Sequence, residues 1–166
     1  MTVHVRRLRA DEVAELRELR LRALCEAPAA FAATLAASED LPLERWAEWT
    51  RAGAAGETHV TIVAVDGDRR LGMVLGRLLD DPPRRTWLEG LWVDPSVRRA
   101  GVGFALIEEV AAWSRERGAD ALDLSVTENN TAAAALYASA GFVETGRRRP
   151  LPADPSRTEI FLTRSL

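Results

Sequence analysis

The sequence contains very few of the side chains that build disulfides, zinc sites and histidine-based catalytic triads. Cys25 is its only cysteine, and His4 and His59 are its only histidines. A single cysteine excludes an internal disulfide and a cysteine-rich metal site. Cys25 follows leucines and alanines at helical spacing, which favours a structural thiol in or beside a core over a nucleophile. We therefore expect no metal and no histidine-based catalytic triad.

Long hydrophobic runs are also lacking. No apolar stretch is long enough to cross a bilayer, and Met1 leads directly into an alternating segment, unlike a signal peptide. The predicted location is therefore cytoplasmic, and no membrane partner is expected. The net charge of −3 gives no overall attraction to nucleic acid. The arginine runs 84–85 and 147–149 are interpreted as solvated surface, so no nucleic-acid partner is expected either.

The length of 166 residues, with 47% apolar residues, fits one globular domain over 1–166. Hydrophobic periodicity and turn residues predict alternating strands and helices. Predicted strands are 2–8, two strands within 59–79 that turn at Asp66-Gly67-Asp68, 86–93, 121–126, 142–148 and 158–164. Predicted helices are 11–26, a region 29–53 broken by Pro42 and ended by Gly53 and Gly56, 101–117 and 130–139. A proline-rich loop is expected at 149–156. This order predicts an α/β (α+β) fold, a mixed sheet with helices on both faces.

The stretch VDPSVRRAGVGF, residues 93–104, places two arginines and two glycines before a predicted helix. A helix N-terminus exposes unpaired N–H groups and partial positive charge, which suits phosphate. Gly101 and Gly103 lack a Cβ that would keep phosphate oxygens away, and Arg98 and Arg99 add charged donors. An ordinary turn before a helix is the alternative.

The two commonest phosphate loops do not fit this stretch. No G-x-x-x-x-G-K-[ST] string occurs in the chain, which excludes a P-loop. Leu106 stands where a Rossmann fingerprint needs its third glycine. A nucleotide bound by a P-loop and a dinucleotide bound by a Rossmann fold are therefore both disfavoured.

A second motif, NTAAAALYASAGF, occupies residues 130–142. Asn130 and Tyr137 are seven residues apart, so at about 100° per residue they share a helix face to within about 20°. Ala133 and Ala134 lie between them and leave room for a ligand. An asparagine N-cap and a core tyrosine are the alternative interpretation of this pair.

Together the two segments resemble the signatures of the GNAT (GCN5-related) N-acetyltransferase superfamily. Arg98, Gly101 and Gly103 resemble its [RQ]-x-x-G-x-[GA] motif, and 130–142 resembles its N-x-x-A-x-x-L-Y-x-x-x-G-F motif. The resemblance covers essentially the whole chain, although residues 9–55 agree only in outline. It implies a mixed, mostly antiparallel sheet of about seven strands, splayed between the fourth and fifth, with helices on both faces.

The resemblance implies an acetyl-CoA-dependent N-acetyltransferase that transfers the acetyl group directly to an amine in a ternary complex. The pyrophosphate would lie on backbone amides of 99–104 and the pantetheine along 91–93, with the Leu91 N–H donating to the thioester oxygen. Tyr137 would protonate or steady the departing CoA thiolate. The predicted cofactor-binding residues are Leu91, Trp92, Val93, Arg98, Arg99, Ala100, Gly101, Val102, Gly103, Phe104, Asn130 and Tyr137.

The acceptor side of the reaction needs a base. An alkylammonium has a pKa of about 10.4, so attack at neutral pH requires a proton acceptor, often through water. Glu89 is the predicted base, and relatives often carry an acid at that place. A surface ion pair with Arg84 or Arg85 is an equal alternative for Glu89. Asp123 and Glu128 are weaker candidates for the base.

The sequence leaves the identity of the acceptor open. Trp46, Trp49 and Trp87 either line a site for a cationic or aromatic amine or pack helices onto the sheet. The preferred acceptor is the primary amine of a small molecule. A protein N-terminus or lysine, or a non-catalytic acyl-CoA-binding module of this fold, are the alternatives. A homodimer is left open.

Overall fold

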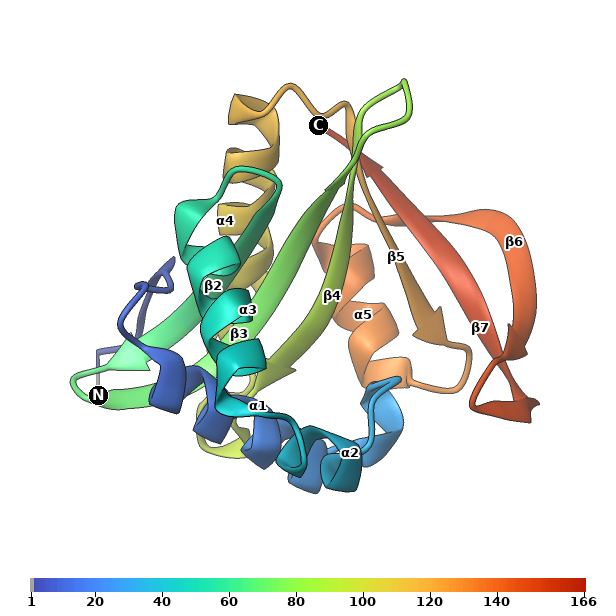
Figure 1. Cartoon of the computed structure of the whole chain (residues 1–166). Helices are drawn as coiled ribbons and strands as arrows, with labels where there is room; N and C mark the ends of the chain where they lie inside the picture. The colour runs from blue at the N-terminus through green and yellow to red at the C-terminus, as the bar shows by residue number, and fades with distance from the viewer. Residues whose placement is uncertain (1) are drawn as a thin grey trace.

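A computed structural model of the chain describes residues 2–166 as one seven-stranded sheet with helices on both faces (Figure 1). The strands are β1 (His4–Arg7), β2 (His59–Asp66), β3 (Arg69–Leu79), β4 (Arg85–Val93), β5 (Ala121–Thr127), β6 (Val143–Leu151) and β7 (Asp154–Ser165). The α-helices are α1 (Val13–Glu26), α2 (Leu35–Glu39), α3 (Leu43–Ala55), α4 (Val102–Glu116) and α5 (Thr131–Ser139). The strand order is β1-β2-β3-β4-β5-β7-β6, which confirms the predicted mixed sheet.

Among residues 2–166, no helix has the length and apolar character needed to cross a membrane. The expectation that the chain has no signal peptide was based partly on Met1. This residue lies outside the described residues.

The sheet splays between β4 and β5. These strands are parallel and pair over three positions only, from Arg85 opposite Ala121 to Trp87 opposite Asp123. Past Trp87 they diverge, as Figure 1 shows, so the β4 edge from 88 to 93 has no strand partner on that side within the described chain. The other strand pairs are antiparallel. The predicted splay between the fourth and fifth strands is confirmed.

Each face of the sheet carries its own core. On one face, α4 buries Leu106, Ile107 and Val110 against side chains of β2, β3 and β5. On the other face, α1 repeats Leu16, Leu19 and Ala23 three and four residues apart, and this stripe packs on β2, β3 and β4. Burial of each such leucine contributes about 2 kcal/mol of transfer free energy. The helix α1 is therefore fixed on the sheet beside β4.

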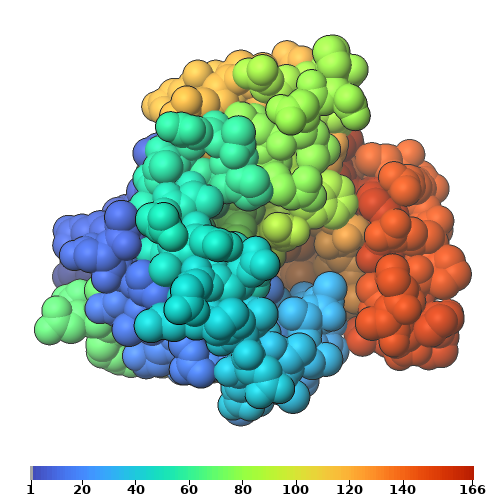
Figure 2. Space-filling view, in the orientation of Figure 1, coloured from blue at the N-terminus to red at the C-terminus, as the bar shows by residue number. Residues whose placement is uncertain are grey.

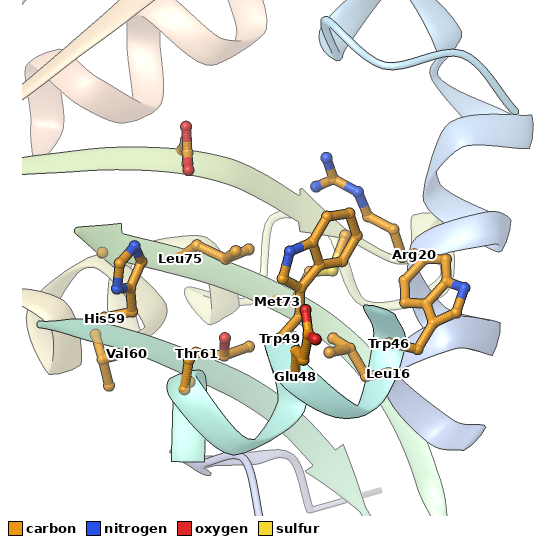
Figure 3. A pocket seen from close by; sticks show the side chains of 14 residues that line it. Leu16, Arg20, Trp46, Glu48, Trp49, His59, Val60, Thr61, Met73 and Leu75 are labelled. Atoms are coloured by element: carbon orange, nitrogen blue, oxygen red, sulfur yellow. The ribbon is translucent and has the colours of Figure 1, made fainter. Parts of the chain in front are cut away.

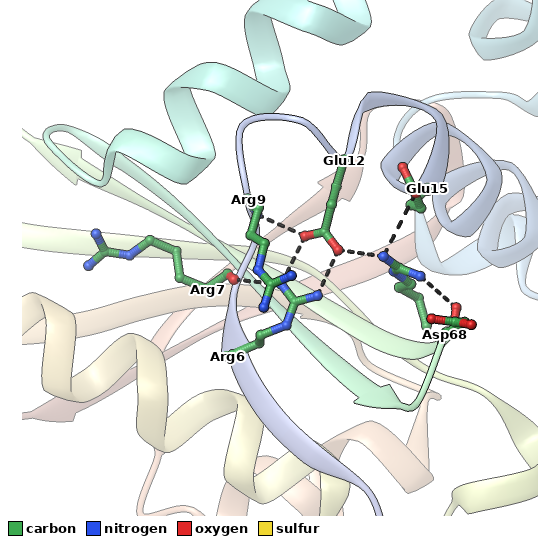
Figure 4. Close-up of polar contacts among 7 residues, drawn as sticks. Arg6, Arg7, Arg9, Glu12, Glu15 and Asp68 are labelled. Atoms are coloured by element: carbon green, nitrogen blue, oxygen red, sulfur yellow. Dashed lines mark hydrogen bonds and ion pairs between the residues drawn. The ribbon is translucent and has the colours of Figure 1, made fainter.

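The start of α1 is anchored by a cluster of charges around Glu12 (Figure 4). Glu12 is 4% exposed and accepts hydrogen bonds from Arg6 at 2.6 and 2.8 Å, from Arg70 at 2.5 Å and from the Arg9 N–H at 2.8 Å. The hydrogen bonds from Arg6, aided by those from Arg9 and Arg70, outweigh burial and lower the pKa of Glu12 to about 2. The cluster ties α1 to β1 and β3.

The end of α3 differs from the prediction. The helix continues through Gly53 and ends at Ala55, with Gly56 (φ 67°) as its C-cap, so the prediction that Gly53 ends the helix was wrong. Gly53 is buried where α3 crosses β2, and a Cβ there would lie 2.2 Å from Oγ1 of Thr61. A close approach of helix and strand, not a helix end, requires this glycine.

The segment 149–156 also differs from the prediction. It is not a loop, because it forms the paired ends of β6 and β7, and only residues 152 and 153 make the turn. Pro150 pairs with Thr158 and Leu151 with Asp154. Proline is tolerated in β6 because this strand is the last in the sheet, and its outer edge has no neighbour in the described chain.

Candidate active site

The loop 98–104 leads into α4 beside the splayed edge of β4. Arg99 (φ 61°) and Gly101 (φ 81°) adopt left-handed backbone conformations on either side of Ala100. Such an alternation gathers successive N–H groups into an anion-binding concavity. The first hydrogen bond of α4 runs from the Ala105 N–H to the Gly101 carbonyl, so the N–H groups of 102–104 have no partner within the helix.

These features of the loop match what a pyrophosphate requires. The Cβ position of Gly101 faces open space, and the exposed ring of Phe104 lies in the first turn of α4. The loop 98–104 therefore offers unpaired donors, partial positive charge and free access for an anion.

Two other residues of the same motif, Gly103 and Arg98, make contacts within the protein instead of leaving space or donors for an anion. A Cβ on Gly103 would lie 2.9 Å from Cδ2 of Leu136, so this glycine lets α4 and α5 pack closely. Arg98 donates through Nε to the Val93 carbonyl at 2.8 Å and through Nη2 to Glu26 at 2.7 Å. The guanidinium therefore binds the loop to β4 and to α1, and these contacts occupy two of the groups that would otherwise donate to phosphate.

Glu26, the last residue of α1, is a site residue that sequence analysis missed. Its carboxylate accepts from Arg98 and also from Nε1 of Trp92 at 2.9 Å. The hydrogen bond from Arg98, followed by that from Trp92, lowers the pKa of Glu26. No motif marks this residue, because its partners lie 66 and 72 positions away in the chain. The Trp92 side chain thus faces α1, while Leu91 and Val93 face the α4 core.

Asn130 and Tyr137 lie at the two ends of α5. The Asn130 side chain caps the helix by accepting from the Ala133 N–H at 3.2 Å. Tyr137 is 8% exposed, and its ring lies 5.6 Å from that of Phe142 in a T-shaped arrangement. These are the contacts of an N-cap and a core aromatic. Burial raises the pKa of Tyr137 to about 12, so the phenol keeps its proton at neutral pH and can donate it.

A cavity of about 400 Å³ opens on the face of the sheet covered by α1 and α3 (Figure 3). Figure 3 shows Arg20 near the Trp49 indole at one end and His59 at the other. Most of its surface is apolar. The lining residues are Leu16, Arg20, Trp46, Glu48, Trp49, Ala52, Gly53, His59, Val60, Thr61, Met73, Leu75, Gly76 and Glu89. The sequence analysis singled out Trp46, Trp49 and Glu89 of this lining, but not Glu48 or the basic groups Arg20 and His59.

Glu89 is the candidate base that the structure places in this cavity. Its side chain is exposed on β4. The two surface partners considered for it are engaged elsewhere: Arg85 binds Asp123 and Thr163, and Arg84 donates to the Arg117 carbonyl at 2.9 Å. The alternative of an ion pair with Arg84 or Arg85 was therefore wrong, and within residues 2–166 the Glu89 carboxylate forms no ion pair and lines the cavity.

The two weaker candidates for the base are held in ion pairs. Burial raises the pKa of Asp123, but hydrogen bonds from Arg85 and Thr163 outweigh it and leave the pKa below its usual value. Glu128 is paired with Arg148. Neither carboxylate belongs to the cavity lining. Both are poorer proton acceptors than Glu89 for an amine bound in the cavity.

The tryptophans divide between the two roles considered for them. Trp46 is 1% exposed and packs inside the molecule, with its ring 5.3 Å from that of Trp49 in a T-shaped arrangement. Trp49 is 46% exposed and forms part of the cavity wall. Trp87 is half-buried, and its ring lies 6.2 Å from that of Phe161 on β7. Trp49 is thus the tryptophan most open to a ligand.

A sheet that splays beside a loop with unpaired N–H donors, with a helix N-terminus at the split, is the arrangement expected of an acyltransferase that uses coenzyme A thioesters. The family described as the acetyltransferase (GNAT) family matches residues 17–142. The chain belongs to this family and is an acetyl-CoA-dependent N-acetyltransferase.

Individual relatives agree on the reaction. The chain is similar to the ribosomal protein bS18-alanine N-acetyltransferase of Escherichia coli (strain K12), at 31% identity over 118 residues, 70% of this chain and 78% of the relative. It is also similar to aminoglycoside N(6')-acetyltransferase type 1 of Klebsiella aerogenes, at 38% identity over 69 residues, 39% of this chain and 45% of the relative. The names of these two relatives give different acceptors: an alanine of a ribosomal protein for the first and an aminoglycoside for the second.

Solved structures share the fold. The PaiA N-acetyltransferase of Thermoplasma acidophilum, solved in complex with coenzyme A, has a TM-score of 0.77 to this chain at 14% identity, and the match covers 100% of both chains. At this low identity the likeness shows a common fold.

Proposed function

We propose that this N-acetyltransferase acetylates the primary amine of a small molecule that binds in the cavity beside Glu89. The observation that carries the proposal is the cavity itself, about 400 Å³ and lined by α1, α3 and the sheet, with the Glu89 carboxylate in its wall, which has no ion-pair partner among residues 2–166. This volume lies within the usual range of small-molecule sites, which are mostly apolar with a few polar groups.

The donor half of the site uses backbone groups. The loop 99–104 receives the pyrophosphate of acetyl-CoA, and the amides of the pantetheine pair with the free edge of β4 at Leu91–Val93 as an added strand would. The Leu91 N–H stabilises the charge that develops on the thioester oxygen during attack. Asn130 fixes the start of α5 beside this edge. The support for this arrangement is the missing β5 partner beyond Trp87 and the free N–H groups of 102–104.

The acceptor half needs a base and an acid. Glu89 takes a proton from the bound ammonium, directly or through one water, and the neutral amine then attacks the thioester carbon and forms the C–N bond. The C–S bond then breaks, and Tyr137 donates a proton to the departing thiolate. A thiol with a pKa of about 8.5 is already a fair leaving group, so Tyr137 accelerates the step without being indispensable.

A second candidate function rests on the relative that acts on an alanine of ribosomal protein bS18. Its similarity extends over 118 residues of this chain. The N-terminus of a peptide is also a primary amine, and the same base and donor site would serve it. In this case the cavity would hold the first side chain of a peptide instead of a whole molecule.

The test is release of CoA from acetyl-CoA, with a panel of small amines and with peptides that begin with alanine. Turnover on small amines supports the proposal, and turnover on peptides alone supports the second candidate. Binding of CoA without turnover on either class would instead indicate a non-catalytic module. A single domain over 1–166 and a cytoplasmic location remain predictions from the sequence, and a homodimer remains open.

A further inference from the structure

Arg20 is a cation in the wall of the cavity that has no ion-pair partner among residues 2–166. It extends from α1, and its guanidinium stacks on Phe31, 4.6 Å from the ring centroid. Figure 3 shows it pointing toward the indole of Trp49. Within residues 2–166 no carboxylate lies within ion-pair distance of it, and its donors make no hydrogen bond. Burial lowers the pKa of Arg20, although Glu89 acts against this, and a guanidinium stays charged at neutral pH.

Several neighbouring arginines are paired, unlike Arg20, whereas Arg17 on the same helix also has no ion pair within residues 2–166 but lies outside the cavity lining. Arg22, on the same helix, contacts Glu18 and Asp94, and Arg98 binds Glu26. Arg85, on the adjoining strand, binds Asp123. Taking a charge out of water is costly unless it gains a partner, so a half-buried and unpaired guanidinium at a ligand cavity is suited to an anionic group of the ligand.

The position of Arg20 relative to Glu89 limits what that ligand is. One Nη atom of Arg20 lies 2.8 Å from where a Cβ on Gly90 would stand, so the guanidinium is against the backbone of the residue that follows Glu89. One molecule in this part of the cavity can therefore place an ammonium at Glu89 and an anion at Arg20. An amine and a carboxylate on the same carbon meet this requirement.

The rest of the cavity fits an apolar substituent. Leu16, Trp49, Met73 and Leu75 form its wall next to the two charged groups. A polycationic acceptor would bring further positive charge to the unpaired guanidinium. A peptide N-terminus has its carboxyl group bound in an amide and would leave Arg20 without a partner.

We infer that the acceptor is a free α-amino acid with an apolar side chain. Its carboxylate accepts two hydrogen bonds from the Arg20 guanidinium, its amine faces Glu89, and its side chain lies between α1, α3 and β3. The inference rests on the proposed function, because it takes the cavity to be the acceptor site. The amine nitrogen bonds to the acetyl carbon, the C–S bond breaks, and the products are an N-acetyl amino acid and CoA.

The test compares pairs of acceptors that differ only in the carboxylate: L-leucine with isopentylamine, and L-phenylalanine with phenethylamine. We expect kcat/KM to be about 10- to 100-fold higher for the amino acid of each pair, the range for a charged hydrogen-bond partner. In Arg20→Met, which keeps the bulk of the side chain, this ratio should fall close to one. Arg17→Met removes the same charge from the same helix outside the cavity lining, and should keep the parent's ratio.

The outcomes separate the inference from the proposed function. If the amines react as well as the amino acids, or if the preference survives Arg20→Met, the inference is wrong and the N-acetyltransferase function stands. If no small amine reacts, the proposed function fails, and calorimetry of L-phenylalanine with the CoA-loaded protein then decides the inference. Binding that is lost in Arg20→Met supports it, and no binding to the parent protein overturns it. Circular dichroism confirms that each variant is folded.

Discussion

The guanidinium of Arg98 donates a hydrogen bond of 2.7 Å to the carboxylate of Glu26, 72 residues earlier in the chain. A second hydrogen bond, to the Val93 carbonyl at 2.8 Å, ties the same guanidinium to the end of β4. Arg98 thus connects three segments, and the loop 98–104 is held in place by a helix that lies outside the motif.

From this contact we expect Arg98→Met and Glu26→Ala each to raise the KM for acetyl-CoA by about 2- to 5-fold, as for a partly exposed ion pair. Because both substitutions break the same link, the double variant should be no worse than Arg98→Met alone. Glu18→Ala, which removes an exposed carboxylate from the same helix, should leave the KM unchanged. Additive effects would mean that Arg98 acts on acetyl-CoA independently of Glu26.

Gly101→Glu should reduce acetyl-CoA affinity by at least about 100-fold, because it places a carboxylate in the concavity that receives the pyrophosphate. The substitution also forces a non-glycine residue to φ 81°, at a cost of about 1–2 kcal/mol. Gly118→Glu is the matched control, since Gly118 has φ 73°, equally open surroundings and a position past the other end of α4. Titration calorimetry that finds equal affinity in both variants would refute the phosphate assignment.

Glu89→Gln should lower kcat at pH 7 by about 100-fold, because the ammonium of the acceptor loses its proton acceptor. The deficit should narrow as the pH approaches about 10, where the amine loses its proton without help. Glu48→Gln, a second exposed carboxylate of the same cavity wall, should follow the parent's pH profile. A profile of Glu89→Gln that superimposes on the parent's removes Glu89 from the mechanism.

Tyr137→Phe should lower kcat about tenfold, in line with a modest general acid, and leave the KM for acetyl-CoA nearly unchanged. The ring stays in contact with Phe142, so the melting temperature should change little. Because burial raises the pKa of Tyr137 to about 12, the phenol is protonated throughout the working range, and the shape of the pH profile should persist. If the single-turnover rate constant of Tyr137→Phe equals that of the parent, Tyr137 serves only as a core residue.

Glu12→Gln should destabilise the fold. The pKa of Glu12 falls from 4.5 to about 2 on folding, so the ionised cluster stabilises the protein fully above pH 4.5 and loses this contribution as the pH falls through 2. The full contribution is on the order of 3 kcal/mol. Urea unfolding at pH 7 and pH 3 should show a smaller loss on acidification in Glu12→Gln than in the parent. Glu15→Gln, a more exposed partner of Arg70, should behave like the parent.

Features that depend on local backbone geometry could be predicted from the sequence. The glycine at 101 is needed for a left-handed turn, and Asn130 is needed at a helix start, so both leave a pattern in neighbouring residues. The turn at Asp66-Gly67-Asp68 was found for the same reason. The segment 149–156 was missed because its prolines indicate a loop, and only the position of β6 at the edge of the sheet makes them compatible with a strand.

The features that depend on tertiary contacts were not predictable in this way. Glu26 and Arg20 stand in a helix full of alternating charges, and nothing nearby distinguishes the paired residue from the unpaired one. The burial of Gly53 against Thr61 depends on where α3 crosses the sheet. The pairing of Arg85 with Asp123 joins strands separated by the whole of α4, so the alternative partner considered for Glu89 was wrong.

The helix α1 carries both Arg20, at the cavity, and Glu26, at the loop, while Glu12 fixes its beginning. A helix held in this manner moves as one body, so a displacement that accompanies binding at one contact is transmitted to the other. Such coupling is reciprocal by thermodynamic necessity: acetyl-CoA alters the affinity for the acceptor by the same factor as the acceptor alters the affinity for acetyl-CoA. Cooperativity between the two substrates is therefore an expected property of this helix.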